Sequence, residues 1–109
     1  MGYIDTMAHF VHPATEDITL EGVLGALADP MRLRIVTALL HEKGCMSCSE
    51  AIPCPEMAKS TLSHHFRILR EAGLIRTTKQ GVENRNVVRA ADINERFPGL
   101  LKLIIKLAE

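Results

Sequence analysis

Three cysteines lie within ten residues of the chain, at Cys45, Cys48 and Cys54. The Cys-x-x-Cys spacing of the first two allows their sulfurs to meet around one turn, either as a disulfide or on a soft metal ion. A third thiol could complete a trigonal metalloid site, or resolve a sulfenic acid or persulfide. The alternative is that they are small buried or loop side chains without chemistry. The spacing fits no standard zinc finger. The sequence therefore identifies no cofactor with certainty, and it does not specify a metal. A soft metal or metalloid bound by the three thiols is the candidate.

Two histidines three residues apart form a second group with ligand chemistry, at His9 and His12. Their imidazoles could meet, but two solvated side chains in a loose arm are the simpler interpretation. His41 is expected to be an exposed residue near the end of a helix.

The segment 59–81 has the pattern of a helix with one apolar and one polar face. Leu62, Phe66 and Leu69 recur at the spacing of a buried stripe. The opposite side carries Ser63, His64, Arg67 and Glu71. A glycine and a short basic hairpin follow, which is the layout of a recognition helix and a wing that place side chains in a DNA groove. The helical angle of His65 lies near the apolar edge and favours packing over base contact.

The net charge of zero hides a strong asymmetry. Residues 59–89 carry seven basic and two acidic side chains, a net charge of +5, whereas the rest of the chain has a net charge of −5. A basic module on an acidic body fits a nucleic-acid footprint on one surface, although an ordinary solvated face is the alternative.

The elements that must position these side chains can be read along the chain. We predict a flexible N-terminal arm over residues 1–16 and one domain over residues 17–109. A helix over 17–28 is followed by Asp29 as N-cap and a second helix over 30–42. Pro53 and Pro55 prevent a long helix in 45–58. The recognition helix is expected over 60–72, with Ser60 as N-cap.

After Gly73 as a left-handed cap with Leu74 as its apolar contact, we expect strands over 74–79 and 86–90 with a turn over 81–85. Asp92 and Glu95 resemble a capping box. The last helix, over 100–108, is apolar nearly all round, so a partner chain is needed to cover it. No apolar run is long enough to span a bilayer and no signal peptide precedes the domain, so we expect no membrane partner and a cytoplasmic protein.

Two motifs resemble the ArsR/SmtB family of winged-helix repressors. Residues 27–35, LADPMRLRI, are similar to the family's L-x-D-P-x-R-L-x-I. Residues 60–75, STLSHHFRILREAGLI, are similar to its S-x-x-S-x-H-L-x-x-L-x-x-A-G-L-V recognition helix. The resemblance implies a mainly α, homodimeric winged helix-turn-helix protein with a small β-hairpin, a repressor that an effector releases from an inverted-repeat DNA operator.

The same resemblance implies the site residues. The DNA-binding candidates are Lys59, Ser60, Thr61, Ser63, His64 and Arg67 on the helix and Lys79, Gln80, Asn84 and Arg85 in the wing. The dimer candidates are Leu20, Val23, Leu24, Leu101, Ile104 and Ile105.

The chain departs from the family's metal sites. The positions of the family's Cys-x-Cys align with Ser47 and Ser49, with Cys48 between them. The family's second site needs acidic and histidine ligands on the last helix, and here Asp92 is followed by no histidine. Three candidates for the effector therefore remain: a thiol-reactive species or a soft metal at Cys45, Cys48 and Cys54, a small organic molecule, or no effector.

Two other function classes stay open beside the repressor. A winged-helix adaptor could use its wing to bind another protein. A small thiol-redox enzyme could use Cys45 and Cys48, but the sequence has no βαβ pattern around them, no phosphate loop and no acid/base pair at catalytic spacing. We predict that the protein is not an enzyme.

Overall fold

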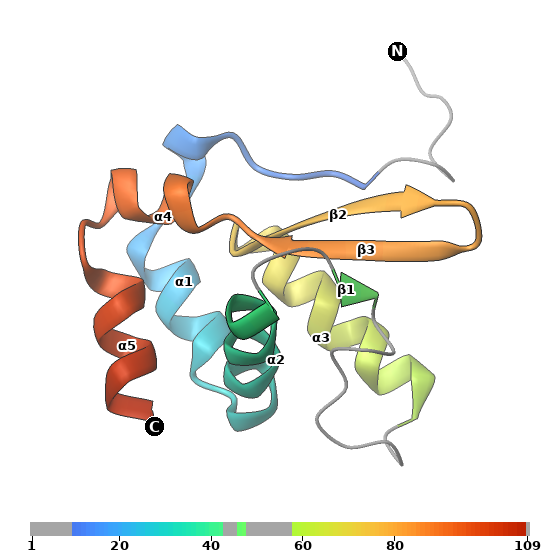
Figure 1. Cartoon of the computed structure of the whole chain (residues 1–109). Helices are drawn as coiled ribbons and strands as arrows, with labels where there is room; N and C mark the ends of the chain where they lie inside the picture. Colours follow the sequence, from blue (N-terminus) through green and yellow to red (C-terminus); the bar gives the residue numbers. More distant parts are fainter. Residues whose placement is uncertain (1–9, 43–45, 48–57, 109) are drawn as a thin grey trace.

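The structure, a computed structural model, describes residues 10–42, 46–47 and 58–108. It is mainly α with a small sheet, as predicted (Figure 1). The elements in chain order are the 3-10 turn η1 (Thr15–Asp17), α1 (Leu20–Leu27), α2 (Pro30–Glu42), β1 (Met46–Ser47), α3 (Lys59–Glu71), β2 (Ile75–Gln80), β3 (Glu83–Val88), α4 (Ala90–Arg96) and α5 (Leu100–Ala108).

The sheet is antiparallel with strand order β1-β3-β2. The hairpin is tighter than predicted, because β2 and β3 pair from Ile75↔Val88 up to Gln80↔Glu83 and leave only a two-residue loop. Gly81, with a φ of +63°, supplies the positive angle that such a loop requires. β3 therefore begins at Glu83, three residues earlier than expected. The short strand β1, which pairs Met46 with Asn86, was not predicted.

The first two helices begin where a side chain caps them. Thr19 Oγ1 accepts a hydrogen bond from the Gly22 N–H at 3.1 Å, so α1 begins at Leu20 and the predicted start at residue 17 was wrong. Asp29 Oδ1 accepts from the N–H groups of Met31 and Arg32 at 2.8 and 3.1 Å, which confirms the predicted cap of α2.

The end of α3 is a Schellman motif, as the glycine predicted. The Leu74 N–H donates to the Leu69 carbonyl and the Gly73 N–H donates to the Arg70 carbonyl, both at 3.0 Å. Gly73 has a φ of +84°, and Leu74 is fully buried. This turn sends the chain from α3 directly into β2, so it sets the angle between the helix and the hairpin.

The two C-terminal helices differ from the prediction only at the start of α4. Arg89, not Asp92, is the N-cap of α4, and its side chain makes no capping bond, so the predicted capping box was wrong. Asp92 lies in the first turn, where a carboxylate favours the helix dipole. α5 spans the predicted residues, after Gly99 adopts a φ of +80° and its N–H donates to Asn94 Oδ1 at 3.0 Å.

One hydrophobic core joins the helices to the hairpin. α2 packs against α1, α3 and β3. The largest fully buried apolar side chains come from α1, α2, α3, β2 and α4 and from the segments just before α1 and just after α3: Ile18, Val23, Ile35, Val36, Phe66, Leu69, Leu74, Ile75 and Ile93. Within the described ranges, no helix is long and apolar enough to cross a membrane.

Candidate nucleic-acid interface

Helix α3 has the two faces that the sequence predicted. Leu62, Phe66 and Leu69 are buried in the core. The polar residues of the opposite face are all exposed: Lys59, Ser60, Thr61, Ser63, His64, Arg67 and Glu71. The core therefore holds the helix by one side and leaves a row of hydroxyl, imidazole and guanidinium groups open to a ligand.

The first turn of α3 differs from the prediction. Ala58 is the N-cap, with no side-chain capping bond, and Ser60 lies one residue inside the helix. Ala58 cannot cap because its side chain has no acceptor, so the first N–H groups keep no side-chain partner at the cap. Together with the exposed Lys59 ammonium, this end of the helix has the character of an anion-binding terminus.

His65 is part of the packing, as its position on the helix indicated. It is 9% exposed, and its Nδ1 accepts a hydrogen bond from Arg32 Nη1 at 3.2 Å. Arg32 Nε also donates to the Ala26 carbonyl at 2.7 Å. One guanidinium therefore ties α1 and α2 to the inner side of α3, and this explains why an arginine occupies this place in the 27–35 motif.

The wing residues fall into two groups. Lys79 and Gln80 are exposed at the end of β2, next to the hairpin loop. Asn84 and Arg85 were expected in the turn, but they lie in β3 and are half-buried, and Arg85 Nη1 lies 3.7 Å from Glu83 Oε1. The shorter loop is the cause, because it moves both residues into the paired part of the strand.

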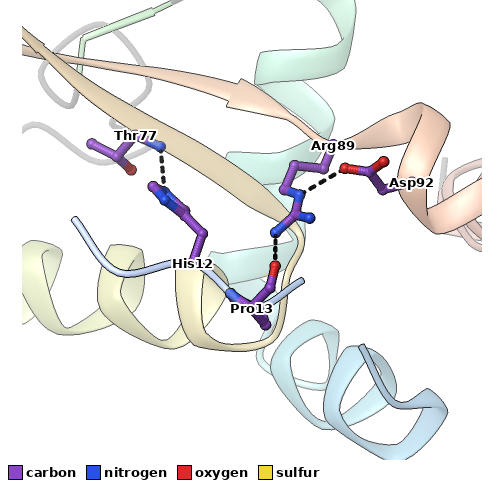
Figure 2. Close-up of polar contacts among 5 residues, drawn as sticks. All are labelled: His12, Pro13, Thr77, Arg89 and Asp92. Carbon is purple, nitrogen blue, oxygen red and sulfur yellow. Dashed lines mark hydrogen bonds and ion pairs between the residues drawn. The ribbon is translucent and has the colours of Figure 1, made fainter. Parts of the chain in front are cut away.

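Residues 10–14 lie alongside β2 (Figure 1), which the prediction of a flexible arm through residue 16 did not anticipate. The Thr77 N–H donates to His12 Nε2 at 2.9 Å, and Arg89 Nη1 donates to the Pro13 carbonyl at 2.8 Å (Figure 2). β2 is an edge strand, so its outward N–H groups need partners. The imidazole supplies one of them, and His12 is not the solvated side chain that was expected. His9 lies outside the described residues.

Arg89 joins the arm to α4. Its side chain is 3% exposed, Nε donates to Asp92 Oδ2 at 2.9 Å, and Nη1 donates to the Pro13 carbonyl. The hydrogen bond from Arg89, with a further one from Thr15, holds the pKa of Asp92 below its ordinary value. Arg89 was counted in the basic module, but its charge is buried and paired, so the exposed charge of that module is smaller than the sequence suggested.

The arm also reaches α3. The guanidinium of Arg70 lies 4.5 Å from the centre of the Phe10 ring, a cation–π contact.

Desolvation by burial, helped by the positive charges of Arg76, Arg89 and Arg70, lowers the pKa of His12 from its ordinary 6.5. His12 is therefore held neutral, which is the form that can accept the Thr77 hydrogen bond.

Four of the six large apolar side chains that are exposed in the described residues lie on α1 and α5, and the other two are Val11 in the N-terminal segment and Val82 in the hairpin loop. Leu20, Leu24, Leu103 and Leu107 are 43, 45, 53 and 74% exposed. Val23 and Leu101 were also predicted to lie at a dimer interface, but they are buried in the core of this chain at 0 and 7% exposure. Ile104 and Ile105 are partly buried against the same core.

Known proteins share this arrangement. A family model described as a helix-turn-helix domain matches residues 27–78. The uncharacterized HTH-type transcriptional regulator MJ1325 of Methanocaldococcus jannaschii is 32% identical over 85 residues, which are 78% of this chain and 90% of that protein. An ArsR-like transcriptional regulator from Rhodococcus sp. RHA1 superimposes with a TM-score of 0.60 at 25% identity, over 81% of each chain. The chain belongs to the ArsR/SmtB family of winged helix-turn-helix transcriptional regulators.

A third relative is named as a homolog of SmtB. The transcriptional repressor SmtB homolog of Synechocystis sp. is 40% identical over 62 residues, which are 57% of this chain and 43% of that protein. As an ArsR/SmtB regulator, the protein is a DNA-binding regulator of transcription, and the mainly α fold with its hairpin agrees with that membership.

The structure describes one of the two predicted sensor positions, Asp92, and does not describe the three cysteines. Cys45, Cys48 and Cys54 lie outside the described residues, so the predicted thiol site stays a prediction. Asp92, the acidic residue at the family's second metal site, accepts a hydrogen bond from Arg89 instead. Within residues 10–42, 46–47 and 58–108, no three His, Cys, Asp or Glu side chains group as metal ligands.

The contacts that sequence reasoning missed are long-range. His12 and Thr77 are 65 residues apart, and Pro13 and Arg89 are 76 apart. The segment around His12 has no helical or strand period, so it was interpreted as a loose arm. The one available signal was the aromatic Phe10, since aromatic residues are rare in solvated tails.

Proposed function

We propose that this ArsR/SmtB protein is a homodimeric repressor that binds an inverted-repeat operator through α3 and the β2–β3 hairpin. The observation that supports this proposal best is the exposed polar face of α3, which carries Thr61, Ser63, His64 and Arg67. A helix held by one apolar side fits the major groove, where Arg67 can donate two hydrogen bonds to guanine or clamp a phosphate. A regulator works in the compartment that holds the DNA, which we propose to be the cytoplasm.

The remaining candidate residues fit contacts to the DNA backbone. Lys59 and the uncapped N–H groups at the start of α3 suit a phosphate. Lys79 and Gln80 at the end of β2 suit the adjacent minor groove or backbone. Asn84 and Arg85 would contribute from the half-buried side of β3, with Arg85 also held near Glu83.

The dimer is proposed to form through the exposed leucines of α1 and α5. Two recognition helices must lie one DNA turn apart, ~34 Å, to read two half-sites. A rigid interface far from the hairpin would set this spacing, and a change in the interface would abolish operator binding.

Release from the operator is proposed to involve Cys45, Cys48 and Cys54, through thiol oxidation or a soft metal or metalloid. The test is operator binding by the reduced protein before and after a thiol oxidant, and separately with arsenite. Loss of binding that is absent in a Cys48→Ser variant supports the proposal. Binding that is indifferent to both treatments rejects a sensor at these thiols.

The central experiment is a titration of the protein onto DNA from its own upstream region at two salt concentrations. We expect Arg67→Ala to weaken specific binding by about 1–3 kcal/mol, since one base or phosphate anchor is lost. Lys59→Gln should weaken binding to all sequences alike and reduce the salt slope by about one per protomer. Arg34→Ala is the control, because Arg34 is exposed on α2 beside the end of α5.

The two results point to different function classes. Tight, salt-sensitive binding that falls in Arg67→Ala but not in Arg34→Ala supports the repressor. Micromolar or weaker binding without sequence preference in the unmodified protein rejects the operator and favours a protein–protein adaptor.

A further inference from the structure

A cavity of about 530 Å³ lies where the end of α2 meets α4 and α5. Its apolar lining comes from Leu40 on α2, Ala90 on α4, and Leu101 and Ile105 on α5. Leu101 is a core residue with 7% exposure, so the cavity reaches down to the hydrophobic core. Its volume is within the range of about 300–1,000 Å³ that is usual for small-molecule sites.

The polar part of the lining is cationic. Lys102 and Lys106 line the cavity from successive turns of α5, and both are exposed. Within the described part of the chain, neither lysine has an ion pair, and the cavity lining contains no acidic residue. Asn94 adds an amide whose oxygen accepts from the Gly99 N–H, which leaves its NH₂ group directed elsewhere as a donor.

We propose that this cavity binds a small amphipathic carboxylic acid, with its apolar body against Leu101 and Ile105 and its carboxylate at Lys102 and Lys106. The apolar floor provides most of the buried surface, and burial of a hydrocarbon chain is favourable in proportion to its area. Two ammonium groups on one rim select an anion over an alcohol or an amine. A small inorganic anion would leave the floor uncovered.

The site is separate from the proposed DNA-binding face of α3 and lies beside the exposed leucines of the proposed dimer interface, with which it shares two of the predicted dimer residues, Leu101 and Ile105. Because an α-helix has about 3.6 residues per turn, Lys102 and Lys106 lie on one side of α5 and the exposed Leu103 and Leu107 lie on the next. A ligand at the lysines would therefore lie beside a dimer interface without being covered by it. It would change the position of α5 relative to α2 and α4, which line the same cavity, and so bias the geometry of the proposed dimer. This regulatory consequence rests on the proposed repressor function, whereas binding itself does not.

Binding is tested by isothermal titration of the full chain with octanoate, compared with octan-1-ol, octylamine and acetate. We expect saturable binding of octanoate, at least tenfold weaker binding of octan-1-ol, and no measurable binding of octylamine or acetate. Equal binding of octylamine, or no saturable binding of octanoate, overturns the proposal.

Two variants with a matched control locate the site. Ala90→Phe should fill the cavity and abolish octanoate binding, whereas Ala91→Phe, at the neighbouring exposed alanine outside the lining, should leave it unchanged. Lys102→Gln with Lys106→Gln should weaken octanoate at least tenfold while leaving octan-1-ol unchanged. Circular dichroism checks that each variant is folded. Equal effects of Ala90→Phe and Ala91→Phe overturn the location.

Operator titration with and without octanoate separates this proposal from the proposed function. Octanoate should change the operator affinity of the unmodified protein and of Ala91→Phe, but not that of Ala90→Phe. Saturable octanoate binding in a protein that binds no operator would reject the repressor and keep the site. An operator affinity that octanoate does not change would keep the site and reject its regulatory consequence.

Discussion

Gly73 allows the segment before α1 to pack closely against the end of α3, because it has no side chain. Gly73 ends α3 with a φ of +84°, and a Cβ at this position would lie 2.5 Å from Ile18 Cγ1 and 2.8 Å from Cδ1. Ile18 belongs to the segment before α1 and is 1% exposed. The glycine therefore serves two needs, a left-handed turn and the close approach of a buried side chain.

We expect Gly73→Ala to lower the free energy of unfolding by about 2–4 kcal/mol, from backbone strain and overpacking together. Gly81→Ala is the matched control, since Gly81 also has a positive φ but nothing within 4 Å of the added Cβ. It should cost about 1 kcal/mol from the backbone alone. Urea unfolding of both variants measures the difference, and equal losses would show that Ile18 can move away.

At the scale of elements, the N-terminal segment acts as a strap over the hairpin and the recognition helix. Phe10 contacts Arg70 on α3, His12 accepts from Thr77 on β2, and Pro13 accepts from Arg89 at the start of α4. These contacts tie together elements whose relative angle matters for DNA binding. The strap depends on a neutral imidazole, because a protonated one has no acceptor for the Thr77 N–H.

This dependence predicts the pH response of stability. The lowered pKa of His12 means that the unfolded chain takes up the proton first as the pH falls through 6.5. The contribution of His12 is therefore complete above pH 6.5, and it is lost as the pH falls toward the lower pKa of the folded state. Below that pKa both states are protonated, and no further change is expected.

The measurement is urea unfolding between pH 5 and pH 8 for the unmodified protein, His12→Gln and His41→Gln. A glutamine carbonyl can accept from Thr77 without titrating, so His12→Gln should lose less stability in acid than the unmodified protein. His41 is exposed at the end of α2, and its variant should follow the unmodified protein. Parallel curves for all three proteins would show that His12 does not control the acid response.

At the scale of the whole molecule, the distribution of apolar residues separates the core from the proposed interface. Fully buried side chains and exposed leucines alternate on α1, where Val23 is in the core and Leu20 and Leu24 are at the surface. The proposed dimer interface is the surface that carries the exposed leucines of α1 and α5. The hairpin extends away from this surface (Figure 1), which suits a dimer with its two wings at opposite ends.

We expect Leu24→Glu with Leu107→Glu to convert the proposed dimer into a monomer without unfolding the chain, because both side chains are at the surface. Light scattering after size-exclusion chromatography measures the mass, and circular dichroism the fold. Val82→Glu is the control, since Val82 is 95% exposed in the hairpin loop, far from α1 and α5. A variant that keeps the mass of the unmodified protein would place the interface elsewhere.

The sequence prediction was most accurate for features that depend on residues close together in the chain. The stripe of Leu62, Phe66 and Leu69, the Asp29 cap and the Gly73 turn depend on residues no more than a few positions apart. Periodicity and capping therefore identified them correctly, and the paired motifs identified the family. The prediction failed at two helix starts. For α1, both Asp17 and Thr19 are residues that can cap a helix, and Thr19 is the cap. For α4, Asp92 was predicted as the cap, but the helix begins earlier, after Arg89.

The sequence by itself determined that this protein has an amphipathic recognition helix followed by a hairpin, because those features are encoded in the spacing of neighbouring side chains. Only the tertiary structure decided that His12 accepts a hydrogen bond from β2, that β1 pairs with β3, and that Val23 and Leu101 are buried in the core of this chain. These facts depend on which surfaces meet when distant segments pack. A pattern along one segment cannot specify that meeting, since it shows that a face is apolar without showing what covers it.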